Sequence, residues 1–431
     1  MGRIYKTARQ TIVWLGDGGD GRQAAIQHVK KFEISNEKHK FTEKEDLELI
    51  TPIFGNQWFY RLWVVQEVVL AKQVVIAIGQ DFASLEQLWK LTRTLRNLFL
   101  DKYWKISGTI SEVIVNLSAI KLLRGRYQKG LDIPILDLMN RTNLFIVTER
   151  KDRLYALYGL VQDVDFPVNY SDNYGHVEMF IDFANWTFAK YGNLDILLIA
   201  RGIASDCKCA GPSWTPCFDT ELIKNLLLVV PHFDASGTGP DVEIHDKKEL
   251  CVVGAFVDTI DVVNRDYEDS YDVNILHQMA LELAAFAGCS DLSGDRYRKL
   301  CAAWILELDK EKEKATEDNI NDVDKFLKGE PTVDLQNLIK TANLWQVGRL
   351  PCLTTGDRFA WAPKHWDTNI LDRGTRSGDR ICILQGGRVP YLLRPQTDGT
   401  YVLVGECWVQ GLMHGEALEL PGYKTETIVL V

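Results

Sequence analysis

The first part of the chain alternates short apolar runs with segments of helical periodicity. Residues 11–15 (TIVWL) are typical of a buried strand, and residues 73–79 (QVVIAIG) form a second strand-like run that ends in glycine. Between them, residues 22–33 and 58–71 have helical patterns, and the polar, charged residues 35–46 predict a loop or lid. The order strand, helix, helix, strand indicates an α/β layer.

Helical patterns dominate the middle of the chain. Leucines recur at roughly helical spacing from Phe82 to Tyr127, and Asp152 is placed to cap a short helix that runs through Tyr158 to Gly159. A further helix is predicted before Gly192, because five apolar residues fall on one of its faces. These residues are Val177, Phe180, Ile181, Ala184 and Phe188.

The character of the chain changes again towards its C-terminus. Residues 201–245 are rich in Gly, Pro, Cys and Ser and predict irregular chain, whereas residues 273–345 are again helical. The charged run at 309–325 within them is typical of a solvated helix or loop. From Gly356 onward, short alternating runs separated by Gly and Pro predict a small antiparallel β unit.

These patterns predict three regions. They are an α/β layer at 1–80, a mainly helical region at 81–345 that includes the irregular segment 201–245, and a small β-rich unit at 346–431.

Composition excludes several classes of protein. The 431 residues carry a net charge of −10 without a basic block, which argues against binding to nucleic acid or to an anionic membrane. The longest apolar stretches, such as residues 62–71, are far shorter than the ~20 residues that span a bilayer. The N-terminus lacks an apolar signal-peptide core, and nine scattered cysteines, an odd number, suit reduced thiols. We therefore expect a cytoplasmic protein.

A glycine-rich run raises the question of nucleotide binding. Residues 16–21 (GDGGDG) satisfy G-x-G-x-x-G between a strand and a helix, the fingerprint of a dinucleotide-binding unit. Two observations oppose this interpretation: Asp17 and Asp20 stand where an anion would bind, and no second strand with a terminal acid follows. A P-loop is also disfavoured, because Arg22 and Gln23 replace its Lys and Ser/Thr. The run is predicted to be a connecting loop.

Glu67 is the most notable polar residue of the predicted helix 58–71. The helix is apolar on most sides, so it is expected to be buried, and a buried carboxylate must be paired or neutralised. One interpretation pairs Glu67 with a neighbouring cation, such as Arg61 or Arg153, as an internal fastener. The other makes Glu67 a catalytic carboxylate in a cleft.

Other candidate chemistry is weak. Three cysteines with a nearby histidine are a poor match to zinc-ligand spacing, so no metal is predicted. The eight histidines lack ligand or triad spacing, and a turn or packing role is expected for His414, near Glu416. The residues weighed for zinc were Cys207, Cys209, Cys217 and His232.

Two blocks of the sequence, RIYKTARQTIVWLG and WFYRLWVVQEVVLAKQVVIAIG, resemble the fungal heterokaryon incompatibility (HET) domain. Segments downstream, including ERKDRLYALYGLV and the C-terminal strands, resemble regions that commonly follow this domain. The resemblance therefore covers most of the chain. The matching residues are Tyr5, Ala8, Trp14, Leu15, Gly16, Trp58, Arg61, Trp63, Gln66, Glu67 and Ala71, followed by Asp152 and Arg153.

The sequence also departs from the usual pattern of the HET domain. Family members usually carry two earlier blocks, Y-x-x-L-S-Y-x-W-G and W-I-D-x-x-C-I-N-Q, and neither occurs in this sequence. We therefore expect a truncated domain that begins at its middle, without its first strands. Such a domain would have an unpaired sheet edge.

The resemblance implies a fungal nonself-recognition protein that signals growth arrest or programmed cell death through other proteins. The HET domain is similar to TIR domains, some of which cleave NAD with a helix-borne glutamate, so Glu67 is the candidate for that role. No bound cofactor is expected, and NAD enters only as a candidate substrate. Three hypotheses follow: a signalling protein without intact catalysis, a TIR-like NAD-cleaving enzyme, and a scaffold reused to bind a small hydrophobic metabolite.

Overall fold

The computed structural model divides into two compact units, Met1–Tyr170 and Ser171–Val431. This division differs from the boundaries at residues 80 and 345 that the sequence patterns predict. The residues described are 2–19, 21–31, 45–101, 108–200, 211–216, 233–237, 239–267, 273–309, 313–332, 338, 346, 348–364 and 374–431.

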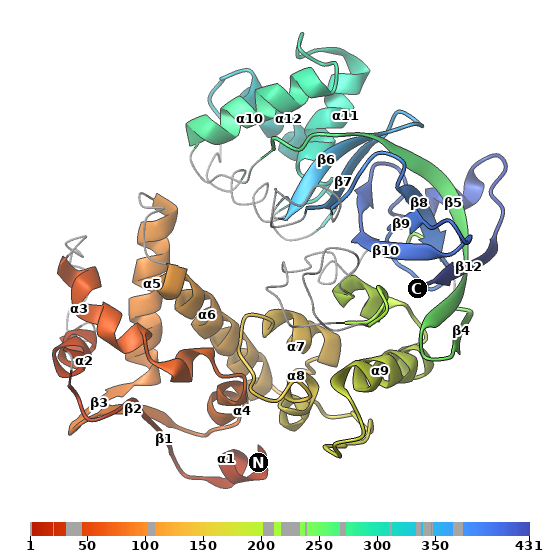
Figure 1. Cartoon of the computed structure of the whole chain (residues 1–431). Helices are drawn as coiled ribbons and strands as arrows, with labels where there is room; N and C mark the ends of the chain where they lie inside the picture. Colours follow the sequence, from red (N-terminus) through yellow and green to blue (C-terminus); the bar gives the residue numbers. More distant parts are fainter. Residues whose placement is uncertain are drawn as a thin grey trace. The chain divides into compact units, whose positions relative to one another are not determined.

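A three-stranded sheet of order β1-β2-β3 organises the N-terminal unit (Figure 1). Strand β1 (Thr11–Trp14) pairs in parallel with β2 (Val74–Ile78), which confirms both predicted strands. Strand β3 (Asp81–Ser84) then pairs antiparallel with β2. The leucine pattern from Phe82 to Tyr127 wrongly predicted a helix at its start, where β3 lies. The reason is a tight turn at Gly79, whose φ of +56° lets the chain reverse directly into β3.

Helices of this unit pack around the sheet. Helices α2 and α5 contact β2 and β3, and α6 packs against α4 and α5. The predicted helix at 22–33 is confirmed as α2, whereas most of the predicted loop at 35–46 lies outside the described residues. The helices are α1 (Gly2–Thr7), α2 (Arg22–Lys31), α3 (Glu45–Phe54), α4 (Trp63–Val69), α5 (Leu85–Asp101), α6 (Gly108–Gln128), α7 (Ile135–Arg141) and α8 (Asp152–Tyr155), with the 3-10 turns η1 (Gln57–Tyr60) and η2 (Tyr158–Leu160).

The predicted helix 58–71 is wrong in its first half. The chain forms the short 3-10 turn η1, becomes extended at Arg61 and only then enters α4. At the break, Arg61 forms a parallel bridge with Ile146, and the Leu62 N–H donates to the Ile146 carbonyl at 3.0 Å. A tertiary backbone pairing therefore interrupts a segment whose side-chain pattern is helical throughout.

The C-terminal unit begins with the helix predicted before Gly192. Helix α9 (His176–Tyr191) buries Phe180, Ile181, Ala184 and Phe188, and it ends at Gly192, whose φ of +61° provides the left-handed C-cap. The 3-10 turn η3 (Asp195–Ile199) follows. Most of the segment 201–245 lies outside the described residues, but its end forms strand β4 (Val242–His245).

Five strands of this unit close a barrel, because their pairings return to the strand from which they start. Strand β5 pairs with β12, β12 with β10, β10 with β9, β9 with β8, and β8 with β5 again. These strands are β5 (Glu249–Val263), β8 (Arg380–Leu384), β9 (Tyr391–Pro395), β10 (Tyr401–Glu406) and β12 (Glu426–Leu430). The predicted antiparallel β unit is thus present, with one parallel pair, β10 with β12.

Strand β5 extends the sheet beyond the barrel. Its far end pairs with β6 (Arg349–Thr354), which pairs with β7 (Phe359–Pro363), and β7 pairs with β11 (Trp408–Val409). The helices α10 (Val273–Phe286), α11 (Gly294–Trp304) and α12 (Glu317–Leu327) lie between β5 and β6 in the sequence and confirm the start of the helical prediction at 273–345. Figure 1 shows them grouped beside β6 and β7.

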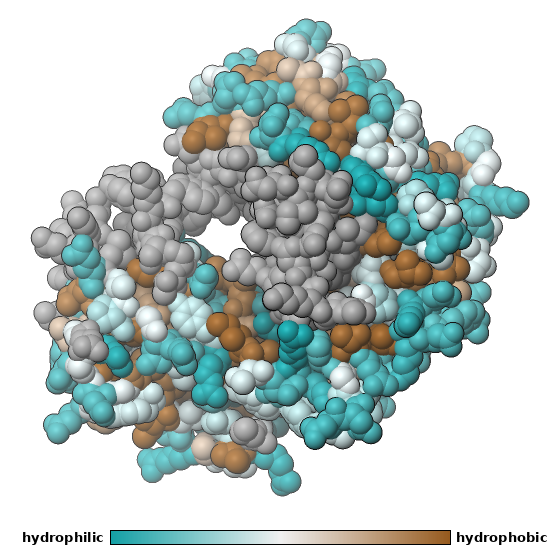
Figure 2. All heavy atoms as spheres, in the orientation of Figure 1, coloured by the Kyte–Doolittle hydropathy of each residue, from teal (hydrophilic) through white to brown (hydrophobic). Residues whose placement is uncertain are grey.

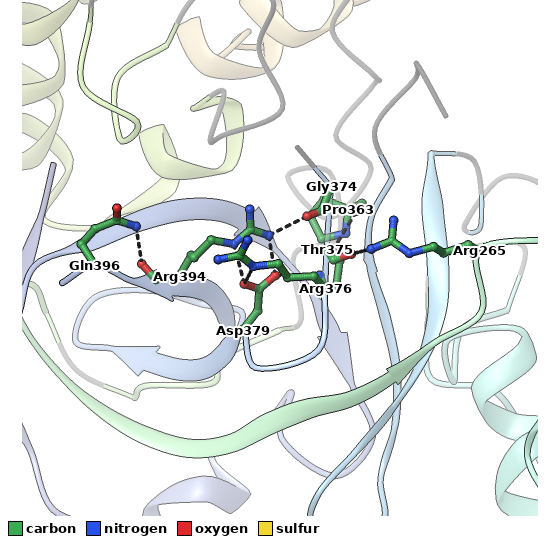
Figure 3. Close-up of polar contacts among 8 residues, drawn as sticks. All are labelled: Arg265, Pro363, Gly374, Thr375, Arg376, Asp379, Arg394 and Gln396. Atoms are coloured by element: carbon green, nitrogen blue, oxygen red, sulfur yellow. Dashed lines mark hydrogen bonds and ion pairs between the residues drawn. The ribbon is translucent and has the colours of Figure 1, made fainter. Parts of the chain in front are cut away.

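A buried ion pair holds the barrel together (Figure 3). The Arg394 guanidinium donates two hydrogen bonds to the Asp379 carboxylate, at 2.8 and 2.9 Å, and a third to the Gly374 carbonyl at 2.6 Å. The side chain of Asp379 is 0% exposed and that of Arg394 is 5% exposed. The carboxylate also accepts from the Arg376 backbone N–H at 2.8 Å. The pair therefore links β9 to the turn that precedes β8.

Within the part of the chain that the structure describes, no helix combines the length and apolarity needed to cross a membrane.

Candidate functional site at helix α4

Helix α4 carries the densest part of the family-like motif, and its burial follows directly from its sequence. Val64, Val65, Val68 and Val69 are at most 2% exposed, so the helix is enclosed on most sides. Gln66 is buried with these valines, so its side chain needs a hydrogen-bond partner within the N-terminal unit.

Gln66 anchors α4 to the turn after α8. Its side chain is 2% exposed, and its Nε2 donates to the Ala156 carbonyl at 2.5 Å. Its Oε1 lies close to Gly159 and Gly2, and a Cβ atom on Gly159 would be 2.6 Å from this oxygen. Gly159 is therefore required for close packing rather than for helix termination, which was its predicted role.

Trp63 joins α4 to α8 through Asp152. The Trp63 Nε1–H donates to Asp152 Oδ2 at 2.9 Å, and the Tyr170 hydroxyl donates to Asp152 Oδ1. The prediction that Asp152 caps this helix is wrong: the N-cap is Lys151, and Asp152 is the first helical residue. The Asp152 carboxylate is used in tertiary contacts instead, because two aromatic donors from distant segments converge on it.

Tyr5 of α1 lies beside Glu67 and near Arg61. The pKa of Tyr5 is raised, first by burial and then by the charge of Glu67 and a hydrogen bond to it, while the Arg61 charge acts in the opposite direction. The structure thus brings Tyr5, from the start of the chain, next to two motif residues of the segment 61–67. The other cation considered as a partner, Arg153, donates to the Asn143 carbonyl at 3.3 Å.

Arg124, which the sequence analysis missed, secures the C-terminal end of α4. This residue of α6 is 7% exposed, and its guanidinium donates to the carbonyls of Val68, Ala71 (2.6 Å) and Lys72 (3.1 Å). The last carbonyls of a helix lack partners within it and carry partial negative charge, so a buried arginine satisfies both needs. Burial also lowers the pKa of Arg124 from its ordinary value.

The remaining motif residues lie around the first strand. Leu15 is 1% exposed, and its carbonyl accepts from Asn56 Nδ2 at 3.0 Å and from Arg22 Nη1 at 3.1 Å. Trp58 contacts Phe59 edge to face, with 5.1 Å between ring centroids. The motif residues therefore lie in three places: beside Glu67, beside Asp152 and after β1. The segments η1 and α4 connect these places. Ala8 is partly buried and Trp14 is exposed.

The glycine run forms a backbone turn. Gly16, Gly18 and Gly21 have φ values of +109°, +89° and +79°, which favour glycine. The amides of Arg22 and Gln23, at the start of α2, donate to the carbonyls of Gly19 and Gly18 at 3.2 and 3.4 Å. These two amides therefore serve the turn itself, in agreement with the loop interpretation.

A cavity of about 540 Å³ lies next to this loop. It is lined by Arg22, Pro52, Gly55, Asn56 and Gln57, and Glu67 is not among these residues. The catalytic hypothesis for Glu67 therefore gains no support from this cavity.

The zinc candidates and His414 add nothing to the candidate site at α4. The four residues weighed for zinc lie outside the described residues, within which no group of three His, Cys, Asp or Glu side chains is placed to hold a metal ion. The His414 amide donates to the Glu416 carboxylate at 2.7 Å, and its ring contacts Phe233 at a centroid distance of 5.6 Å. These contacts agree with a turn and packing role for His414.

The hydrogen bond from Tyr170 to Asp152 can be tested by spectroscopy. The pKa of Tyr170 is raised well above its ordinary value by burial and by its bond to Asp152. Asp152→Asn removes the negative charge, so we expect the pKa of Tyr170 to fall towards its usual range. NMR of ring-labelled tyrosines at alkaline pH, with Tyr170→Phe to assign the resonance, measures this change. An unaltered Tyr170 titration in Asp152→Asn would show that the bond to Asp152 does not raise the pKa of Tyr170.

Comparisons with known proteins match both ends of the chain. The family model for heterokaryon incompatibility protein (HET) matches residues 1–67, which include β1 and most of α4, and the model for the Het-6 beta-barrel domain matches residues 368–425. Heterokaryon incompatibility protein 6, OR allele, of Neurospora crassa is 21% identical over 96% of this chain and 78% of its own length. No solved structure gives a significant match, so the expected likeness to TIR domains is not confirmed. The two model matches and this relative together support a protein of the heterokaryon incompatibility (HET) family, in which the match to the N-terminal HET domain is partial.

Proposed function

We propose that this protein acts in heterokaryon incompatibility, as a cytoplasmic signalling protein that arrests growth or triggers cell death when incompatible hyphae fuse. Its relative in Neurospora crassa is named heterokaryon incompatibility protein 6, and the alignment covers 96% of this chain, which includes both units. We further propose that it signals through contacts with other proteins and without catalysis of its own.

The proposal that the protein signals without catalysis rests on one observation: the motif side chains form contacts within the N-terminal unit. Trp63 donates a hydrogen bond to Asp152, and Gln66 donates one to Ala156 at the end of the same helix α8. Gln66 also lies close to Gly159 and Gly2. Gln66 is buried, Trp63 and Asp152 are partly buried, and their contacts fix the relative positions of α1, α4 and α8. We propose that the motif maintains the shape of the N-terminal unit that the partner protein recognises.

Inducible expression in a fungal host tests the proposal. The wild-type chain is expected to arrest growth. Asp152→Ala removes the acceptor of both Trp63 and Tyr170 and should abolish most of the arrest at equal protein level. The matched control is Asp132→Ala, an exposed carboxylate in the same unit, which should arrest growth like the wild type. Normal growth of cells that accumulate the wild-type chain, or full arrest by Asp152→Ala, would contradict the proposal.

The NAD-cleaving alternative rests on the position of Glu67 beside Tyr5 and Arg61. It differs from the signalling proposal in one measurable respect: growth arrest would be accompanied by a loss of NAD that depends on Glu67. The metabolite-binding alternative predicts instead that growth is unaffected and that a small apolar ligand raises the thermal stability of the protein.

A further inference from the structure

Strand β1 lies at the edge of the N-terminal sheet, whose described order is β1-β2-β3 (Figure 1). The amides of Thr11 and Leu15 donate to carbonyls of the β2 side, Gln73 at 2.8 Å and Ala77 at 2.9 Å. Backbone groups of successive strand residues point to opposite sides, so those of Ile12 and Trp14 point away from β2. They are positioned to pair with a further strand.

The side chains on this edge are apolar and exposed. Figure 2 shows apolar residues interspersed among hydrophilic ones on the visible face of both units. In the N-terminal sheet they share one face: Ile12 is 58%, Trp14 54% and Phe82 52% exposed, and the register places Trp14 and Phe82 both opposite Ala77. The strand contains no charge and no proline, the usual guards of a free edge.

Charges of opposite sign flank the strand. Arg9 precedes β1, Asp17 follows it, and both are exposed. An antiparallel neighbour of the same sequence would place the Arg9 end of one strand beside the Asp17 end of the other. A twofold axis would repeat this complementarity, so the edge is complementary to itself.

We propose that a second copy of this chain pairs with β1, antiparallel and centred on Val13. Ile12 of each copy then lies opposite Trp14 of the other as a hydrogen-bonded pair, which uses the outward backbone groups of both residues. The two sheets join into one continuous sheet, and the apolar faces formed by Ile12, Trp14 and Phe82 become adjacent. The occupant of this edge is another molecule of the same protein.

Analytical ultracentrifugation of the full chain tests the proposal through a charge exchange. The wild type is expected to form dimers. Arg9→Asp and Asp17→Arg, each alone, place like charges together and should weaken the dimer about tenfold. The double variant Arg9→Asp/Asp17→Arg restores opposite charges and should return the dissociation constant to within about threefold of the wild type. Trp14→Lys should abolish association, because it guards the edge with a charge.

Each outcome has a defined meaning. Circular dichroism and thermal melting establish that the variants remain folded. A monomeric wild type at high micromolar concentration would overturn the proposal and leave the edge to a different protein or to another segment. A dimer that the single charge reversals do not weaken, or that the double exchange fails to restore, would overturn the antiparallel β1 pairing.

Discussion

Replacing Arg394 by methionine is expected to destabilise the C-terminal unit by about 3–5 kcal/mol, because Asp379 is left as a buried, uncompensated charge. The carboxylate is fully enclosed and receives two of its hydrogen bonds from Arg394. Unfolding by urea, followed by hydrogen exchange of peptides from β8 and β9, measures the loss separately from the N-terminal unit.

Two further variants separate charge from packing. Arg394→Met/Asp379→Asn removes both charges and should recover at least about half of the lost stability. Arg376→Met changes a side chain that is 45% exposed and 3.9 Å from Asp379, and it should stay within about 0.5 kcal/mol of the wild type. If all three variants lost a similar amount of stability, the Arg394–Asp379 pair would not be the main link between β9 and the turn before β8.

Arg124→Met is expected to destabilise the N-terminal unit by about 2–4 kcal/mol, since several buried carbonyls at the end of α4 lose their donors together. The loss should appear as faster hydrogen exchange in α4 and in the segment that leads into β2. The stability of Arg124→Lys should lie between that of the wild type and that of Arg124→Met, because an ammonium group cannot span the same carbonyls as a guanidinium.

The control for Arg124 is Lys129→Met, which removes an exposed charge just after the same helix. It is expected to leave α4 protection unchanged. Equal effects of Arg124→Met and Lys129→Met would mean that overall charge, rather than the bonds to α4, determines the stability of this region.

Local patterns predicted those elements whose burial follows from their own sequence. The run TIVWL became β1 because Val13 and Leu15 bury one face, and α9 ends at Gly192 because its left-handed backbone favours glycine. Strand β5 escaped prediction, although it is the strand at which the barrel closes. Its burial changes along its length as its partners change, so no single alternation runs through it.

The contacts of the motif residues could not be predicted from the sequence. The family-like motif identified Trp63, Gln66, Glu67 and Asp152, and the structure brings their segments together. Asp152 was assigned a local capping role because its sequence neighbours resemble a helix start, yet Trp63 and Tyr170 are its partners. Arg124 left no signal, because a buried arginine that binds backbone carbonyls imposes no pattern on the residues it contacts.

The most direct test of the central claim, that the α4 motif supports signalling rather than NAD cleavage, is to measure NAD during growth arrest. Cells expressing the wild-type chain and cells expressing Glu67→Gln are compared at equal protein level, alongside purified protein incubated with NAD. The account predicts arrest by both chains with unchanged cellular NAD and no turnover by the purified protein. A fall in NAD with the wild type that is absent in Glu67→Gln would contradict it and make Glu67 a catalytic residue.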